Sequence, residues 1–187
     1  MNTRFNFCFL LAMFISATAT AQLGEGSSVI QAGGGWSSAI IESNAETANG
    51  YMVNTLYEKW LVSPVGIGGS VHYLHVRENT EEGTGNFASL PLYLNGKYYF
   101  GKDKFRIFVM GSVGFQFSWR NLEAASGNSG SDHDSGITAG IGTGLVYTIT
   151  PKVLLNMNYS LYWIKNAYYS NGLVNTISLN LGYVLNK

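Results

Sequence analysis

One stretch of the sequence, from Phe105 to Trp119, places an apolar residue or glycine at every second position without a break over fifteen positions. Every odd-numbered residue in it is apolar or glycine, and the even-numbered residues include Arg106, Ser112 and Gln116. A side-chain period of two predicts a β-strand with one apolar face. Fifteen residues is about three times the usual strand length in a soluble protein and suits a tilted strand that crosses a lipid bilayer. The segment therefore predicts a membrane-spanning strand.

The first 21 residues have the features of a secretory signal peptide. Arg4 supplies a positive charge, residues 7–15 form an unbroken apolar run, and residues 19–21 (Ala-Thr-Ala) match a cleavage site. The apolar run is too short for a helix that spans a membrane. We expect residues 1–21 to be removed and residues 22–187 to form one domain.

Composition narrows the class of protein further. Charged residues make up 12% of the chain and the formal net charge is zero, which argues against the clustered positive charge that nucleic acid requires. Aromatic residues reach 14%, and the one cysteine, Cys8, lies in the predicted signal peptide. No segment after residue 21 approaches the roughly 18 continuous apolar residues of a transmembrane helix. Such an exported, aromatic-rich chain is typical of a closed β-barrel in lipid.

Seven further segments show strand-like patterns, which makes eight predicted strands in all. They cover residues 27–38, 51–62, 65–78, 86–100, 105–119, 135–150, 153–163 and 174–186. Short turns at 63–64, 101–104 and 150–152 alternate with longer connections near 39–50, 79–85, 122–134 and 167–173. Short turns at one end and long loops at the other are expected of an outer-membrane barrel. The prediction is an all-β fold, an eight-stranded antiparallel up-and-down transmembrane β-barrel with both termini on the periplasmic side.

Alternation assigns each predicted strand an outward and an inward face. The residues expected to face lipid are Ile107, Val109, Val113, Phe115, Phe117, Leu155, Leu161, Leu179 and Leu181. The polar residues expected to face the lumen are His72, Asn95, Lys97, Arg106, Gln116, Asn156, Asn158 and Asn180. Because the interior of an eight-stranded barrel is just wide enough for side chains, we expect a hydrogen-bonded polar plug rather than a pore. Lys97 and Arg106 require an anionic partner there, and Glu58 is the expected counter-ion.

Two further expectations concern bulky residues. Glycines on the sixth predicted strand should leave room for large side chains from across the lumen. Aromatic residues should form two outward girdles at the membrane interfaces. The girdle near the short turns comprises Tyr57, Trp60, Tyr98, Phe100, Tyr147 and Tyr183, and the girdle toward the longer loops comprises Tyr73, Phe117, Trp119, Tyr159 and Trp163.

Candidate chemistry is sparse. A Ser-His-acid enzyme that modifies lipid A requires a nucleophile, a base and an acid within hydrogen-bond reach. His72 has no acidic residue at a spacing that implies contact, and His75 is expected to point outward. We therefore assign no catalytic residue, no cofactor and no enzymatic activity, with a lipid A-modifying hydrolase or acyltransferase as the alternative.

Acidic residues gather in the segments predicted to form the long loops. Asp132, His133 and Asp134 lie in a Gly/Ser-rich stretch expected to be a solvated loop. They make a weak candidate for Ca²⁺, which requires about six to eight oxygen ligands. Counting the flanking ends, the acidic residues are Glu42, Glu46, Glu78, Glu81, Glu82, Glu123, Asp132 and Asp134, against Arg77, Arg120 and Lys165. This acidic rim would engage divalent cations that bridge lipopolysaccharide, engage a basic partner, or serve only as a solubilising surface.

Three segments carry a resemblance to a known family: residues 90–100 (LPLYLNGKYYF), residues 104–114 (KFRIFVMGSVG) and residues 140–151 (GIGTGLVYTITP). They resemble the small outer-membrane β-barrel domain family of Gram-negative bacteria, particularly its Bacteroidetes-type members. The resemblance covers most of residues 22–187 and implies an outer-membrane β-barrel domain of the OmpA/OmpX type with no particular chemistry. The chain departs from many proteobacterial barrels because it ends in Lys187 rather than in an aromatic residue.

Together these observations predict an integral protein of the outer membrane with a structural, envelope-integrity or partner-binding role. The expected partners are outer-membrane lipid and lipopolysaccharide, or a larger outer-membrane protein complex, and nucleic acid is not among them. Three alternatives stay open: a lipid-modifying outer-membrane enzyme, a narrow channel, and an accessory subunit of a larger complex.

Overall fold

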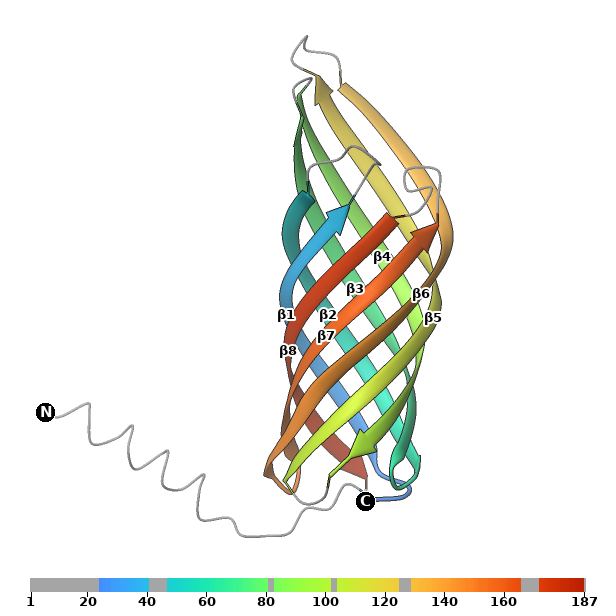
Figure 1. Cartoon of the computed structure of the whole chain (residues 1–187), viewed down its shortest axis with the longest axis vertical. Helices are drawn as coiled ribbons and strands as arrows, with labels where there is room; N and C mark the ends of the chain where they lie inside the picture. Colours follow the sequence, from blue (N-terminus) through green and yellow to red (C-terminus); the bar gives the residue numbers. More distant parts are fainter. Residues whose placement is uncertain are drawn as a thin grey trace, which may run out of the picture.

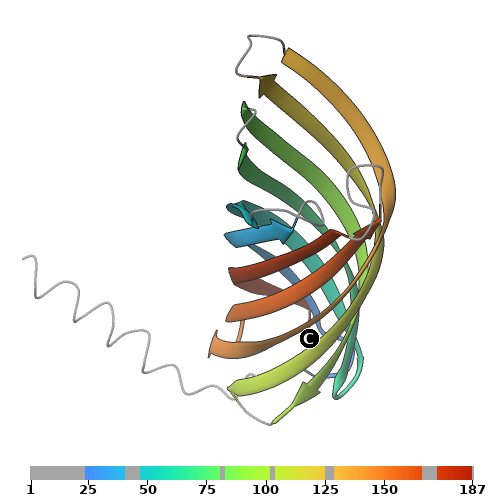
Figure 2. The same ribbon diagram turned by 45° about the horizontal axis from the view of Figure 1, so that its top comes forward.

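The computed structural model describes residues 24–40, 47–80, 83–101, 104–124, 129–165 and 172–186. These residues form eight antiparallel strands that close into a barrel in chain order, with β1 paired to both β2 and β8 (Figures 1 and 2). The strands are β1 (Ser28–Ile40), β2 (Thr47–Val62), β3 (Val65–Thr80), β4 (Gly83–Phe100), β5 (Phe105–Ala124), β6 (Ser129–Thr150), β7 (Val153–Lys165) and β8 (Gly172–Asn186). The predicted eight-stranded up-and-down barrel is confirmed.

The barrel has two distinct ends. The connections β2–β3, β4–β5 and β6–β7 lie at one end, together with the start of β1 and the end of β8 (Figure 1). We call this the turn end and the opposite end the loop end. Gly101 adopts a positive φ of 92° in the β4–β5 turn, a conformation that glycine reaches without steric cost. The predicted signal peptide lies outside the described residues, and no helix in the described ranges is long and apolar enough to cross a membrane.

The connections at the loop end are shorter than predicted because the strands continue further. β5 extends to Ala124 and β6 begins at Ser129, whereas the sequence pattern placed a loop over residues 122–134. The register is unbroken from Phe105↔Tyr147 to Glu123↔Ser129. Because a Gly- and Ser-rich segment has no alternating apolar residues, the sequence signal for a strand stops before the backbone hydrogen bonding between the strands does.

Strand length divides the barrel into two sides. β4, β5 and β6, which we call the tall strands, have 18, 20 and 22 residues. β7, β8 and β1, which we call the short strands, have 13, 15 and 13. The tall strands rise well above the short strands at the loop end (Figure 1).

Inward glycines make room for bulky residues of neighbouring strands. Gly140 is paired with Tyr162 of β7, and Gly144 is paired with Phe108 of β5. A Cβ on Gly144 would lie 2.5 Å from Cζ of the Phe108 ring, and one on Gly140 would clash with Cδ1 of the Tyr162 ring. The prediction that these glycines leave room for large side chains is confirmed, but the rings come from the adjacent strands and not from across the lumen.

Trp60 does not belong to an outward girdle as predicted. Its side chain is 1% exposed and stacks inside the barrel on Tyr99, with ring centroids 4.2 Å apart. The reason is the alternation of β2, where Glu58 and Trp60 share the inward face and Lys59 is exposed between them.

Candidate functional site

The interior of the barrel is built in three layers. Strand β7 shows the order from turn end to loop end: it turns inward first Leu154, then Asn156 and Asn158, then Tyr162 and Ile164. The turn-end cluster is apolar and contains Val29, Trp60, Tyr99, Phe108, Met110, Val146, Leu154 and Val184. The loop-end cluster is also apolar and contains Ala39, Ala48, Met52, Leu74, Val76, Phe87, Tyr93, Tyr162, Ile164 and Val174. A polar layer lies between the two clusters.

The two apolar clusters were not anticipated from the sequence. The prediction was a hydrogen-bonded polar plug in which large inward side chains such as Phe108, Met110 and Tyr162 also occupy volume. The structure gathers apolar side chains into two clusters on either side of the polar layer. A signal was present: inward positions near both ends of the predicted strands are apolar, as Met52 and Val184 show. Apolar clusters at both ends separate the layer between them from bulk solvent.

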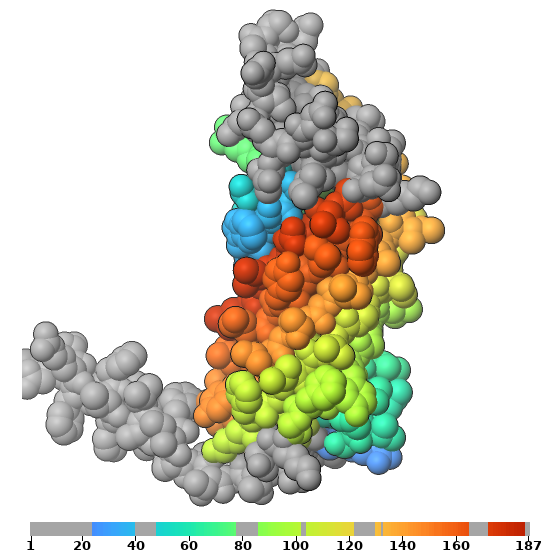
Figure 3. All heavy atoms as spheres, in the orientation of Figure 1, coloured from blue at the N-terminus to red at the C-terminus, as the bar shows by residue number. Residues whose placement is uncertain are grey.

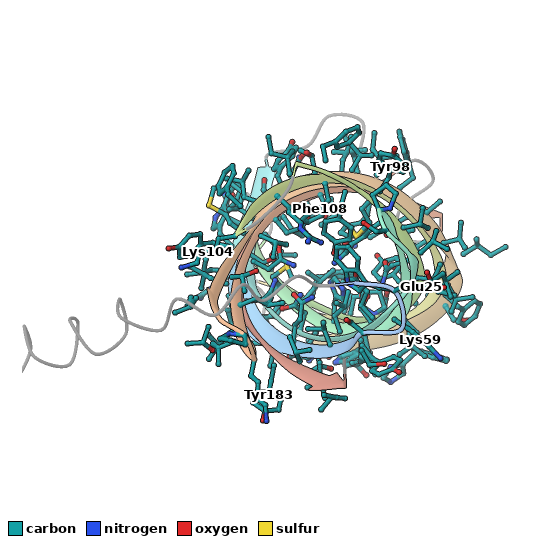
Figure 4. The ribbon with its side chains drawn as sticks, turned by 90° about the horizontal axis from the view of Figure 1, so that it is seen from below. Glu25, Lys59, Tyr98, Lys104, Phe108 and Tyr183 are labelled. Carbon is teal, nitrogen blue, oxygen red and sulfur yellow. The ribbon has the colours of Figure 1, made fainter. Side chains whose placement is uncertain are left out.

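The eight polar residues predicted to face the lumen, among them His72 and Lys97, are all buried, none more than 8% exposed. Of the nine predicted lipid-facing residues, seven are exposed on the outer surface, namely Ile107, Val109, Val113, Phe115, Phe117, Leu179 and Leu181. Leu155 and Leu161 are half-buried. The view along the barrel shows the division directly: Phe108 points inward, while Lys59, Tyr98, Lys104 and Tyr183 point outward (Figure 4).

A buried ion pair anchors the turn-end side of the polar layer. The Lys97 ammonium lies 2.8 Å from Glu58 Oε2, and the Tyr99 hydroxyl donates to Glu58 Oε1 at 2.6 Å. Glu58 is thus the counter-ion of Lys97, as predicted. Gly66 leaves room for the carboxylate, since a Cβ there would lie 3.1 Å from Glu58 Cδ. Arg106 lies over the Trp60 ring, 4.9 Å from its centroid, in a cation–π contact.

A serine and a histidine do meet inside the barrel. His72 Nε2 lies 3.0 Å from Ser70 Oγ, Asn95 donates to the same Ser70 oxygen at 2.9 Å, and Ser112 donates to Asn95 Oδ1 at 2.7 Å. In the part of the chain that the structure describes, the hydrogen bonds of this group include no carboxylate. The apolar clusters separate Ser70 from both ends of the barrel. The arrangement lacks an orienting acid and a route for substrate, so its geometry is that of a packing network.

Asp132, His133 and Asp134 lie in strand β6 and not in the solvated loop that the sequence predicted. Alternation along a strand directs His133 to the face opposite Asp134, and the side chain of Asp132 lies outside the described residues. No group of three or more His, Cys, Asp or Glu side chains that could hold a metal ion occurs among the residues described. The prediction of a mobile acidic loop at this position was wrong because β6 keeps its pairing with β5.

The outer surface carries aromatic side chains at two levels. Near the turn end the exposed aromatics are Tyr57, Tyr98, Phe100, Phe105, Tyr147 and Tyr183, and toward the loop end they are Trp36, Tyr51, Phe117, Tyr159 and Trp163. Aliphatic side chains such as Val113 and Leu179 are exposed between the levels. Figure 3 shows one face of this surface, where side chains of β5 to β8 lie side by side. Aromatic girdles that border an aliphatic band define a small membrane-spanning β-barrel.

Comparison with known proteins places the chain in a family. The family model described as "Outer membrane protein beta-barrel domain" matches residues 7–184, and the chain belongs to this family. It is accordingly an integral outer-membrane protein. None of the curated proteins compared with the chain matches it.

Solved structures share the fold at low sequence identity. The attachment invasion locus protein Ail of Yersinia pestis is 18% identical, with a TM-score of 0.61 over 86% of this chain and 99% of Ail. Neisserial surface protein A is 16% identical, with a TM-score of 0.60 over 85% of this chain and 99% of its own. OprG of Pseudomonas aeruginosa is 14% identical, with a TM-score of 0.55 over 90% of this chain and all of OprG. At such identities the likeness establishes the fold alone.

Proposed function

We propose that this protein is a non-conducting, non-catalytic outer-membrane barrel that binds a partner at its loop end. The observation that carries the proposal is the length of the tall strands. β5 and β6 contain 20 and 22 residues, whereas a tilted strand crosses a bilayer in about 9–11. The loop-end part of each tall strand is therefore available outside the membrane. A rigid paired ribbon that projects from the bilayer suits recognition.

The filled interior supports the exclusion of a channel. Two apolar clusters close the polar layer at either end, and the cavity within that layer has a volume of about 10 Å³. Ion conduction requires a continuous hydrated path. Planar-bilayer recordings of the purified protein should show no single-channel steps, and reproducible steps would contradict this part of the proposal.

The exclusion of catalysis rests on the histidines. His72 is sealed inside with Ser70, and His75 lies on the outer surface, where it stacks on Tyr51 with ring centroids 5.2 Å apart. Neither histidine forms a described Ser-His-acid arrangement. Lipid A extracted from cells that overexpress the protein should match lipid A from cells that express a His75→Ala variant.

The partner that we propose for the loop end is chosen to complement the negative charge of that end. The sequence carries eight acidic and three basic residues in and beside the predicted long connections, which suits a basic protein surface or lipopolysaccharide bridged by divalent cations. Ail, a structural relative, has been solved in complex with the heparin analogue sucrose octasulfate, which supports ligand binding by barrels of this fold. The acidic balance here points to a different ligand charge.

Replacement of residues 119–135 by a tight turn removes the projecting part of the β5–β6 hairpin and leaves the membrane part intact. Native membranes solubilised in mild detergent should yield a stoichiometric partner with the full chain and none with the shortened variant. Addition of EDTA distinguishes the two partners, because it releases cation-bridged lipopolysaccharide and not a basic protein. Recovery of the bare barrel from both forms would contradict partner binding.

The proposed orientation has both termini and the three short turns in the periplasm, as in other outer-membrane barrels. An epitope inserted after residue 126 should be accessible to antibody on intact cells, whereas the same epitope after Pro151 should not. The reverse pattern would overturn the orientation without affecting the fold.

A further inference from the structure

A small cavity of about 10 Å³ lies within the polar layer. The lining residues that concern its chemistry are Asn54, His72, Asn156, Asn158, Tyr162 and Asn180. They come from β2, β3, β7 and β8, so the cavity forms only when the barrel closes. Its volume is close to what a single water molecule needs.

Five of these six residues have a buried polar atom without a hydrogen-bond partner within the protein. The atoms are Asn54 Oδ1, His72 Nδ1, Asn156 Oδ1, Asn158 Oδ1 and Asn180 Oδ1. Buried polar groups are normally paired, because an unpaired group loses its bonds to water without replacement. Five such atoms around one cavity indicate a guest rather than five independent exceptions.

The unpaired atoms are mainly acceptors because the amide nitrogens are already engaged. Asn156 Nδ2 donates to Gln31 Oε1 at 2.7 Å, and Asn158 Nδ2 donates to Ser160 Oγ at 2.9 Å. Asn180 Nδ2 donates to Ser178 Oγ at 3.3 Å. The carboxamide oxygens that remain require a donor.

Two kinds of small guest can bind to unpaired acceptor atoms, a water molecule and a cation. The charge of the neighbouring side chains decides between them. Lys97 lines the same cavity. The Lys97 ammonium pairs with the Glu58 carboxylate, so a second cation in the cavity would lie close to a positive charge that is already buried. A further cation is unfavourable in such a low-dielectric site.

We propose that the polar layer contains a binding site for one water molecule, which donates its two hydrogens to two of the unpaired acceptors that Asn54, His72, Asn156, Asn158 and Asn180 place around the cavity. This water completes the hydrogen bonding between strands that are far apart in the sequence. The inference is independent of the proposed partner binding, since it concerns the sealed interior. Because the apolar clusters close both ends, the water exchanges with bulk solvent only when the barrel opens.

The full chain, refolded in detergent and crystallised with and without thallium(I), tests the site directly. The expected result is one density peak within about 3.2 Å of two or more of the carboxamide oxygens, without thallium anomalous signal. A thallium peak in the cavity would show that the site binds a cation and would contradict the proposal of a water molecule. An empty cavity, or side-chain amides that hydrogen-bond to one another, would show that there is no binding site.

Oxygen-17 relaxation dispersion provides a second readout in solution. Asn158→Leu removes an acceptor at the cavity and should lower the number of long-lived internal waters by one. Thr176→Val is the matched control, because Thr176 is a buried polar residue of β8 that does not line the cavity, and its count should stay unchanged. An unchanged count in Asn158→Leu would contradict the proposal. If that variant fails to refold, the crystallographic result on the unmodified chain decides.

Discussion

The interior and the outer surface of this barrel are formed by the same strands, yet the two faces accept different substitutions. On β5, Arg106 is buried over an indole ring, while its neighbour Ile107 is exposed. Inside, polar atoms meet defined partners at defined distances, and glycines mark positions with no room. Outside, an apolar side chain of almost any shape can meet acyl chains. Specificity is therefore concentrated inside, and the outer surface is specified by hydrophobicity and depth.

Two glycines express this contrast. A Cβ on the inward Gly35 would meet the backbone of β8, 2.7 Å from Ser178 Cα, whereas a Cβ on the outward Gly111 would have nothing within 4 Å. Both residues lie in the middle of strands. The environment across the strand, and not the residue type, decides what each position tolerates.

The largest expected effect is on the interior charge. Lys97→Met leaves Glu58 buried without its cation and should lower the free energy of unfolding by about 3–5 kcal/mol. Lys59→Met, its exposed counterpart two strands away, should change it by less than about 0.5 kcal/mol. Urea titration of the refolded barrel, followed by tryptophan fluorescence, measures both. The double variant Glu58→Gln/Lys97→Met should recover part of the loss, and no recovery would show that the ion pair is not the cause.

A charge placed on the outer surface should have a cost that depends on depth. Val113 lies midway between the two aromatic levels on β5, so Val113→Arg should destabilise the barrel in lipid vesicles by about 2–4 kcal/mol. Leu185→Arg, close to the turn-end interface, should cost only about 0–1 kcal/mol. Equal values for the two variants in the same unfolding titration would contradict the proposed membrane position.

The glycine pair provides the next comparison. Gly35→Ala forces a methyl group against the backbone of β8 and should destabilise the barrel by up to about 3 kcal/mol. Gly111→Ala places the same methyl group in open space and should be neutral or slightly stabilising, by about 0.4–1 kcal/mol, because alanine reduces the freedom of the unfolded chain. Thermal unfolding in detergent compares the two, and similar losses would show that interior space is not limiting.

The smallest contrast concerns two tyrosine hydroxyls. Tyr99→Phe removes the 2.6 Å bond to the buried Glu58 carboxylate and should cost about 1.5–3 kcal/mol. Tyr159→Phe removes the 3.0 Å bond to Asn175 on the outer surface, where about 0.5 kcal/mol is expected. If the exterior substitution proved as costly in urea titration, the distinction between the two regions would not extend to hydrogen bonds.

Much of the interior was predictable residue by residue, and the errors have physical causes. Alternation indicated correctly that Glu58 and Lys97 come from strands that bring them together at the turn end. The expectation of aromatic girdles misplaced Trp60, whose position on β2 shares the inward parity of Glu58. The apolar pattern also ended β5 too early and began β6 too late, because both faces of a strand are in contact with water above the bilayer and the pattern disappears there.

The sequence by itself determined the strand count, the closed-barrel class and the side of the wall on which most residues lie. It could do so because acyl chains and a packed lumen impose a period of two on each strand locally. Only the tertiary structure decided which inward residues meet. Asn156 donates to Gln31, 125 positions away, because closure of β1 on β8 sets the stagger of the whole barrel. The three layers and the central cavity follow from that closure.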